Sequence, residues 1–251
     1  MFVDRKTGKW AHRKFTDLLE YLQPGDVMVM NNADADLVPL ESPEGIRMVP
    51  ALPPYIKRKK IEDFTKEDFE RYRTVYASVP GSKAAPTAGF HFTKEILGKI
   101  KSLGVSLCFV TLHVSYDTYK PIRSENINDH TMHGEKFHVP DSTIESVLKA
   151  KQEGRRVIAV GTTAVRTLES LEIDDFRPHS PHISGQTHLF IQPGYSFKIV
   201  DALLTNFHRP RSTVLVMVSA FAGRELILSA YEEAIREKYR LFSYGDCMLI
   251  V

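Results

Sequence analysis

The sequence predicts an α/β fold, a three-layer α/β/α sandwich built around a mixed sheet. Short apolar runs rich in β-branched residues recur along the chain, and segments with helical periodicity lie between them. Two successions of strand, helix and strand can be followed, from Val105 to Val160 and from Val157 to Ile191. Strands that alternate with helices pack as layers of helices against a sheet.

The predicted elements follow one another along the whole chain. The strands are short apolar runs at Val27–Met30, Val105–Val114, Val157–Val160, His188–Ile191, Thr213–Val218 and Asp246–Val251. The helices are predicted at Thr93–Leu103, Ser142–Glu153, Thr163–Leu171 and Arg224–Arg240. The first helix opens at a threonine cap, and the first two stop at Gly104 and Gly154.

Composition is that of a globular protein and sets broad limits on function. The chain has 251 residues, of which 43% are hydrophobic, so a substantial core is feasible, and we expect one domain over residues 1–251. Its formal net charge of +2 permits a nucleic-acid partner without requiring one. Cys108 and Cys247 lie in apolar runs, which favours buried free thiols over a disulfide. With no signal peptide and no apolar stretch of membrane length, a cytoplasmic location away from membranes is expected.

The segment Asn31–Lys60 is the least structured in pattern. It is rich in proline and ends in the basic run Lys57-Arg58-Lys59-Lys60, and we expect a surface connection. The run is interpreted as a solvated face, with contact to phosphate as the alternative.

Three polar motifs could carry chemistry. In Ala85–Thr93, Pro86 and Gly89 shape a tight turn, and glycine lets a ligand approach the backbone. His91 precedes a helix there and could act as a base; the alternative is a packing turn with a hydrogen-bonded histidine. In Val157–Glu169, a buried strand runs into Gly161-Thr162-Thr163 and a helix, a terminus that can bind anions, with Arg166 in the first turn. The alternative is a plain capped strand-to-helix turn.

The third motif is Asp201–Arg211, where Asn206 and His208 precede the predicted strand at Thr213 and indicate a functional loop; the alternative is a structural histidine. The histidines around His130–Glu135 lack the convergent spacing of a metal site, so no metal is expected. None of the common phosphate, dinucleotide or hydrolase motifs is present. The residues by themselves thus indicate an α/β protein, expected to be an enzyme, with an anion-binding turn.

Many stretches of this chain resemble the S-adenosylmethionine:tRNA ribosyltransferase-isomerase family of queuosine biosynthesis. Among them are LPPYIKR (Leu52–Arg58), AAPTAGFHFT (Ala84–Thr93), DHTMHGE (Asp129–Glu135), RVIAVGTTAVRTLES (Arg156–Ser170), DALLTNFHRPRSTVLVMVSAFAG (Asp201–Gly223) and AYEEAIREKYRLFSYGDCMLI (Ala230–Ile250). They run in family order and cover most of the chain from Leu52 onward.

The resemblance implies a specific reaction. S-adenosylmethionine serves as co-substrate and ribosyl donor, and the aminomethyl group of a deazaguanine base in tRNA attacks the ribosyl moiety. Adenine and methionine leave, and epoxyqueuosine forms. Such chemistry needs a base beside the sulfonium and a clamp for the methionyl carboxylate.

Laid over the matched motifs, that chemistry suggests roles for eleven residues. His91 or His208 would be the base, and Gly161, Thr162, Thr163 and Arg166 would hold the carboxylate. Asp201, Thr205 and Asn206 would hydrogen-bond the sugar or base, with Asp201 also a catalytic candidate. Thr87 and Gly89 would line the donor site.

This chain departs from the family pattern in several places, and two of them bear on its domains and acceptor. It passes from Asn32 almost directly to Leu52, so the family's inserted small β-barrel is expected to be absent and 31–60 to be a shortened connection. Ser115–Asp117 replaces a glycine-containing stretch, which favours a different acceptor as one alternative; a non-catalytic nucleotide- or tRNA-binding module is another. An oligomer or a partner chain would supply any missing surface for binding tRNA.

Overall fold

The computed structural model describes residues 1–42, 45–58, 60, 63–172 and 183–251. Within them one sheet of nine strands forms the body, in the order β11-β9-β8-β3-β10-β12-β13-β1-β2. Its strands are β1 (Phe2–Asp4), β2 (Lys9–Ala11), β3 (Val27–Asn31), β8 (Ser106–Leu112), β9 (Glu135–Val139), β10 (Val157–Val160), β11 (Ile183–Thr187), β12 (Ala202–Asn206) and β13 (Cys247–Ile250). Four central strands, β8, β3, β10 and β12, are parallel to their neighbours within this group, while β9 and β13 run antiparallel beside them. The predicted mixed sheet is confirmed.

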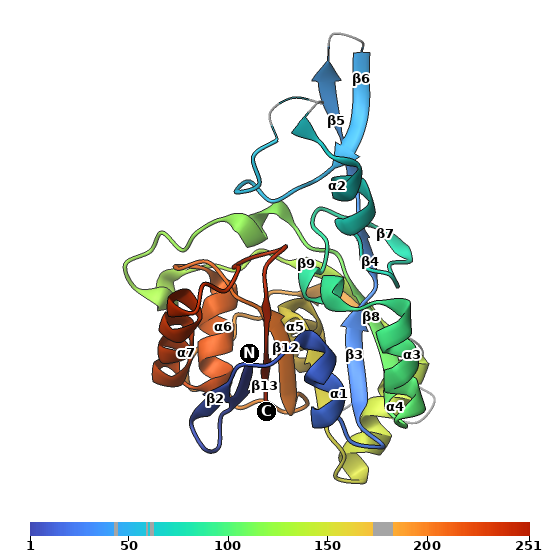
Figure 1. Ribbon diagram of the computed structural model, residues 1–251, viewed down its shortest axis with the longest axis vertical. Coiled ribbons are helices and arrows are strands. Elements are labelled where there is room, and N and C mark those ends of the chain that lie inside the picture. The colour runs from blue at the N-terminus through green and yellow to red at the C-terminus, as the bar shows by residue number, and fades with distance from the viewer. Residues whose placement is uncertain (43–44, 59, 61–62, 173–182) are drawn as a thin grey trace.

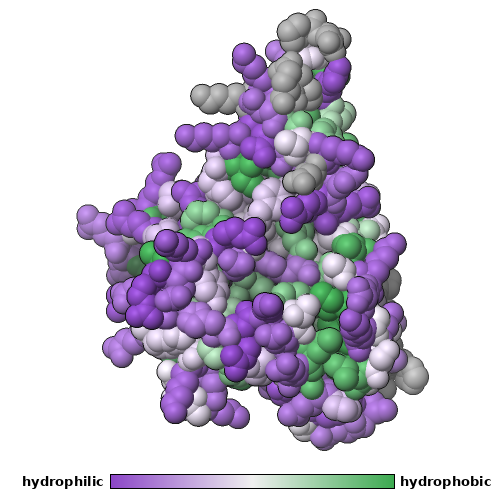
Figure 2. Space-filling view, viewed as in Figure 1, coloured by the Kyte–Doolittle hydropathy of each residue, from purple (hydrophilic) through white to green (hydrophobic). Residues whose placement is uncertain are grey.

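Helices cover both faces of this sheet, as the predicted three-layer sandwich requires (Figure 1). On one face lie α4 (Asp141–Gln152), α5 (Thr162–Glu169), α6 (Thr213–Ala222) and α7 (Arg224–Arg236). On the other lie α1 (Leu18–Tyr21), α3 (Lys94–Ser102) and the short 3₁₀ helices η1 (Phe15–Asp17) and η3 (Thr87–His91). Figure 2 shows hydrophobic surface between α1 and α3, where this second layer is thin.

Side-chain alternation in the central strands explains the two cores. In β3, Val27 and Val29 belong to the cluster under α4–α7, whereas Met28 and Met30 pack under α1 and α3. Successive side chains of a strand point to opposite faces, so an all-apolar strand is stable only when both faces are covered. Every residue of β3 is accordingly buried.

Several predicted element boundaries are confirmed by the structure. Thr93 caps α3 through its side chain, which accepts a hydrogen bond from the Ile96 amide. Gly104 follows that helix with φ of 80°, a conformation that disfavours other residues. Cys108 and Cys247 are free thiols, as expected; Cys108 is buried and Cys247 is half-buried.

Two predicted strands are wrong. The β-branched run from Thr213 forms helix α6, capped by Ser212 and packed against α5 and α7, because burial on several sides suits an all-apolar helix as well as a strand. His188–Ile191 is irregular, and the strand β11 ends just before it at Thr187. The polar-looking segment before His208 instead supplies the central strand β12.

Between β3 and α3 the chain forms a small projecting unit. Its elements are β4 (Ala33–Ala35), β5 (Leu37–Ser42), β6 (Gly45–Pro50), α2 (Lys66–Arg71) and β7 (Val79–Ser82). The β5–β6 hairpin extends away from the body (Figure 1). The described part of 31–60 is therefore a hairpin rather than an irregular connection, and its prolines are tolerated because both strands are edge strands. The sheets described in this region have two strands each, and none of them closes into a barrel.

No single helix in the described ranges is long and apolar enough to cross a membrane. Helices α6 and α7 reach the required length and composition only when taken together, and they are bent by 113° relative to each other.

Candidate functional site

The four central parallel strands end at the same edge of the sheet. From β3 the chain continues to β8 on one side, and it later returns to β10 on the other side of β3. Strand order reverses at this point, and ligands of open α/β sheets bind outside the carboxyl ends of strands beside such a reversal.

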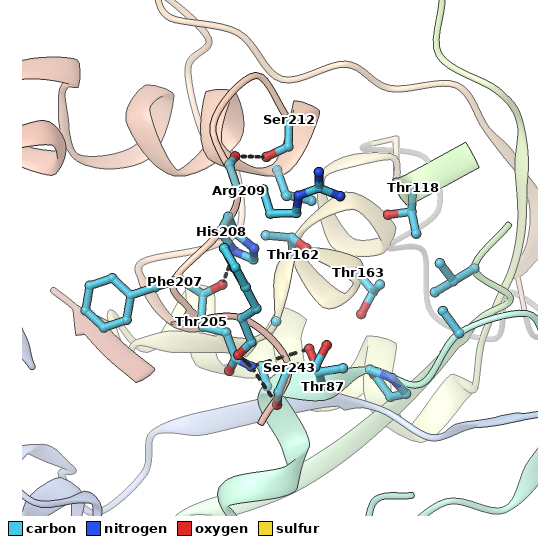
Figure 3. Close-up of a pocket in the computed structure, with 18 of the residues that line it drawn as sticks. Thr87, Thr118, Thr162, Thr163, Thr205, Phe207, His208, Arg209, Ser212 and Ser243 are labelled. Atoms are coloured by element: carbon cyan, nitrogen blue, oxygen red, sulfur yellow. Dashed lines mark hydrogen bonds between the residues drawn. The ribbon is translucent and has the colours of Figure 1, made fainter. Parts of the chain in front are cut away.

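A cavity of about 120 Å³ opens at this edge (Figure 3). It is bounded by the turn before η3, the start of α5, the segment after β12 and the loop before β13. Its polar lining includes Tyr55, Thr87, Thr118, Lys120, Thr162, Thr163, Thr205, Asn206, His208, Arg209, Ser212 and Ser243. Because the lining contains two cations and, within the described chain, no carboxylate, the cavity favours an anionic ligand.

The start of α5 supplies backbone donors to this cavity. Gly161 precedes the helix with φ of 86°, and Thr162 and Thr163 form its first turn. The first amides of a helix have no intrahelical acceptor and carry the positive end of its dipole. The buried hydroxyl of Thr163 also lacks a hydrogen-bond partner within the described structure. The predicted anion-binding turn thus lines a cavity.

His208 lies beside this turn in the cavity wall. In Figure 3 its ring and Thr162 lie on one side of the cavity, with Thr87 and Ser243 on the other. The Nε2 of His208 lies 2.8 Å from the Thr205 hydroxyl. The backbone amide of His208 donates a hydrogen bond to the Tyr231 hydroxyl at 2.8 Å. Burial lowers the pKa of His208 to about 4, so the ring is neutral at pH 7.

Asn206 connects this cavity to His91. Its amide nitrogen donates to the carbonyl oxygens of Phe242 and Ser243 at 3.0 and 3.3 Å, so its amide oxygen faces His91. The Nε2–H of His91 therefore donates to that oxygen at 2.9 Å. His91 does not line the cavity with His208; its ring lies on the other side of β12, against Phe15. The structure thus separates the two histidines that the sequence offered as alternatives.

A second, larger cavity of about 440 Å³ adjoins the first. The two share Val114, Thr118, Lys120, Pro121, Thr162, Thr163 and Val214. Arg166 lies in the wall of this second cavity, but its guanidinium forms a buried ion pair with Glu135 and donates to the carbonyl oxygen of Leu189 at 3.1 Å. Arg166 thus lines a cavity together with Thr162 and Thr163, with its charge matched by Glu135 inside the protein.

Two other candidate residues lie away from the cavity. Asp201 precedes β12 at the opposite end from Asn206, where it pairs with Lys151 at 2.9 Å and accepts from the Val157 amide at 2.8 Å. Gly89 is buried under Tyr76 and Thr74, so its small size serves packing rather than ligand approach. Both residues act in the scaffold that carries the site.

The basic run is partly used in structure. Arg58 pairs with Asp68 at 2.9 Å, and Asp68 forms the capping box of α2 with Thr65. Lys57 and Lys60 are exposed, which fits the solvated face favoured by the sequence, and Lys59 lies outside the described residues.

Comparison with known proteins identifies the family. A family model described as queuosine biosynthesis protein matches residues 45–250. The chain belongs to this family. Proteins called S-adenosylmethionine:tRNA ribosyltransferase-isomerase in Carboxydothermus hydrogenoformans and Natranaerobius thermophilus are each 54% identical to it, over 80% and 79% of this chain. The alignments cover 56% of each relative, so the chain spans about half the length of the curated relatives it matches.

A solved structure of the same family supports the fold. The S-adenosylmethionine tRNA ribosyltransferase of Thermotoga maritima is 31% identical, with a TM-score of 0.67 over 100% of this chain and 91% of that chain. This member of the queuosine biosynthesis family therefore shares the α/β architecture of a family enzyme.

Several cavity residues were missed because their motifs carry no chemical signal of their own. Tyr55 comes from LPPYIKR and lies 2.5 Å from the Ser243 hydroxyl, while the Arg209 guanidinium lies over its ring at 5.7 Å. Phe242 and Ser243 sit in an ordinary-looking turn near the C-terminal strand. Only the matched motifs LPPYIKR and YRLFSYGD pointed to these segments. Among the described residues, no group of three or more His, Cys, Asp or Glu could hold a metal ion.

Proposed function

We propose that this chain transfers and isomerises the ribosyl group of S-adenosylmethionine onto the aminomethyl-deazaguanine base of tRNA. The products are epoxyqueuosine in tRNA, adenine and methionine, and the reaction takes place in the cytoplasm. One observation carries the proposal most directly: the matched motifs AAPTAGFHFT, VGTTAVRTLE and LLTNFHRP, far apart in the chain, together line one cavity at the carboxyl ends of β10 and β12.

The donor is proposed to bind with its methionyl carboxylate at the start of α5. The amides of Thr162 and Thr163 and the orphaned Thr163 hydroxyl would donate to it, and Arg209 would add positive charge. Arg166 acts indirectly, because its bonds to Glu135 and Leu189 fix the helix that presents those donors.

His208 is proposed as the base that removes the proton next to the sulfonium. It lines the donor cavity, is neutral at pH 7, and has its ring orientation set by Thr205. A base must reach the reacting proton, which favours His208 over His91. His91 is a positioning residue, since its donated hydrogen bond orients the amide of Asn206.

The tRNA is proposed to approach over the rim of the two cavities. Lys120 and Arg123 come from the segment that follows β8, and Arg209 comes from the loop after β12. The Ile122 amide donates to the Arg211 carbonyl at 2.8 Å, which ties these segments together. Such a cationic rim suits the phosphates of a nucleic acid whose base enters the cavity.

Adenine release from S-adenosylmethionine in the presence of precursor tRNA tests the proposal. We expect release by the wild type and a roughly hundred- to ten-thousandfold lower rate for His208→Gln, the range that a general base contributes. His138→Gln, on β9 and bonded to Ser184, is the matched control and should keep the wild-type rate. Donor binding without adenine release by the wild type would instead favour a binding module, and no donor binding would refute the proposal.

A further inference from the structure

A third cavity lies on the other side of β12, and of its lining residues only His91 has a role in the function proposed above. Its volume is about 470 Å³, within the range of roughly 300–1,000 Å³ common for ligand pockets. It opens between η1–α1 and the loop that leads into β13, on the face that Figure 1 turns toward the viewer. Within the described chain, it shares no lining residue with the two adjoining cavities.

Aromatic rings form much of its wall. Phe2 stacks on Tyr21 with ring centroids 4.1 Å apart and planes 20° from parallel. Phe15 lies against the His91 ring at 5.3 Å, and Tyr239 lines the cavity as well. Walls of this kind bind planar rings by stacking, and they do so for any base because every base has a π-face.

Cations surround the aromatic wall. Arg13, Lys14 and Lys238 line the cavity, and the Arg13 Nε donates to the Tyr21 hydroxyl at 2.9 Å, which holds its guanidinium beside the rings. Two acids also line it, Glu237 and Asp246. Each lies near an arginine: Arg236, which also pairs with Glu233 at 2.6 Å, lies 3.5 Å from the Glu237 carboxylate, and Arg240 lies 3.7 Å from that of Asp246. The cavity as a whole therefore favours a ligand that carries negative charge.

His91 gives this wall a hydrogen-bond acceptor. Because its Nε2–H is donated to Asn206, the other ring nitrogen, Nδ1, carries a lone pair. An exocyclic amino group or a ring N–H of a heteroaromatic base is the complementary donor. The same residue reaches Asn206 in the donor cavity, so the two cavities meet at one hydrogen bond.

We propose that this cavity binds a nucleotide, with its base stacked among Phe15, Tyr21 and His91 and its phosphate on Arg13, Lys14 and Lys238. The ligand is either a free nucleotide or one residue of an RNA strand, since both present the same base and phosphate. Bound there, it steadies His91 and through it the Asn206 amide.

Calorimetric titration with adenosine 5′-monophosphate tests the proposal directly. Lys14→Ala/Lys238→Ala removes two exposed cations from the cavity, and Lys94→Ala/Lys101→Ala removes two exposed lysines of α3 as a control with the same charge change. We expect an affinity at least about tenfold weaker for the first variant, because each charge-assisted contact to phosphate is lost, and unchanged for the control. Adenosine, which lacks the phosphate, should bind the wild type and both variants equally.

A second comparison separates this cavity from the donor cavity. His208→Gln should bind the nucleotide as the wild type does, whatever its effect on adenine release. Affinity lost in His208→Gln but kept in Lys14→Ala/Lys238→Ala would overturn the proposal, because the nucleotide would then occupy the donor cavity. No binding of the nucleotide at millimolar concentration would overturn it too. Competition between the mononucleotide and the RNA pentamer A₅ shows whether the cavity prefers a free nucleotide or a residue of an RNA strand. The ligand that binds more tightly identifies which of the two the cavity takes.

Discussion

Two neutral histidines flank the carboxyl end of β12, and their different surroundings indicate different roles. His208 shares the donor cavity with Thr162 and Thr163, whereas His91 lies behind Asn206. Burial lowers the pKa of both rings. The charged form of each is disfavoured because the protein offers less solvation than water.

This desolvation predicts how stability depends on pH. The folded-state pKa of His208 is about 4, against about 6.5 in an unfolded chain, so between these values the unfolded state binds more protons. The free energy of unfolding should therefore fall as pH drops from about 6.5 toward 4, by at most about 3–4 kcal/mol for this residue. Urea unfolding at a series of pH values measures it, and His208→Gln should show a shallower decline. An equally steep decline in the variant would show that His208 does not contribute.

Gly89 offers a second test at the residue scale. A Cβ at this position would lie 2.0 Å from the Tyr76 hydroxyl and 2.6 Å from Thr74 Cγ2, whereas at Gly98 in α3 it would meet nothing within 4 Å. Gly89→Ala should destabilise the fold by about 1–3 kcal/mol through overpacking. Gly98→Ala should stabilise it by about 0.5–1 kcal/mol, since alanine is the better helix former. Thermal unfolding compares the two, and similar effects at both positions would contradict the packing role.

At the scale of elements, α5 joins the anion-binding turn to the sheet edge. Arg166 connects this helix to Glu135 on β9 and to the irregular segment at Leu189, while Glu169 accepts from the amides of Ile199 and Val200 just before β12. These buried contacts fix where the helix begins and hence where its free amides point.

Breaking the buried pair should be costly. Glu135→Ala leaves the Arg166 guanidinium uncompensated, and such losses amount to about 3–5 kcal/mol. The double variant Glu135→Leu/Arg166→Met removes both charges and should lose less stability than either Glu135→Ala or Arg166→Ala. Denaturant unfolding of the set measures this. A double variant as unstable as the sum of the single ones would mean that the two residues act independently.

At the scale of the whole molecule, the distribution of charge determines how the proposed tRNA substrate would be held. The net charge is only +2, and Arg58 of the basic run is engaged by Asp68. The cationic rim of the cavities is the better placed surface, because its residues line the cavities that the proposed tRNA base would enter.

We expect tRNA affinity of the isolated chain to be about micromolar or weaker and to fade as salt rises. Each phosphate contact adds about 0.7–0.9 to the magnitude of the logarithmic salt slope, so Arg123→Gln/Arg209→Gln should make the slope visibly shallower. Filter binding across a salt series, with Lys57→Ala/Lys60→Ala for comparison, measures it. If only the lysine variant changed the salt slope, the basic run would be the surface that contacts the tRNA phosphates. Nanomolar binding at high salt would refute the prediction.

Local sequence rules determined much of this protein. The alternation of apolar runs with capped helical segments predicted the layered fold, since strand burial and helix capping depend on near neighbours. The strand-to-helix turn at Gly161 was predicted as an anion-binding terminus for the same reason, and it does line a cavity. The projecting hairpin and the helical state of Thr213–Ala222 were not predicted, because an apolar or proline-rich run has no period that separates the alternatives.

Tertiary structure alone decided which polar residues share the site. Asn206 and His91 are far apart in sequence yet joined by a hydrogen bond, and Arg166 meets a carboxylate from another strand. Whether a charged side chain serves a ligand or an internal partner depends on what the fold places against it. Burial lowers the pKa of His208, so its ring is neutral, and it requires that the Arg166 guanidinium find hydrogen-bond partners inside the protein. Neither effect can be read from the residues that neighbour them in sequence.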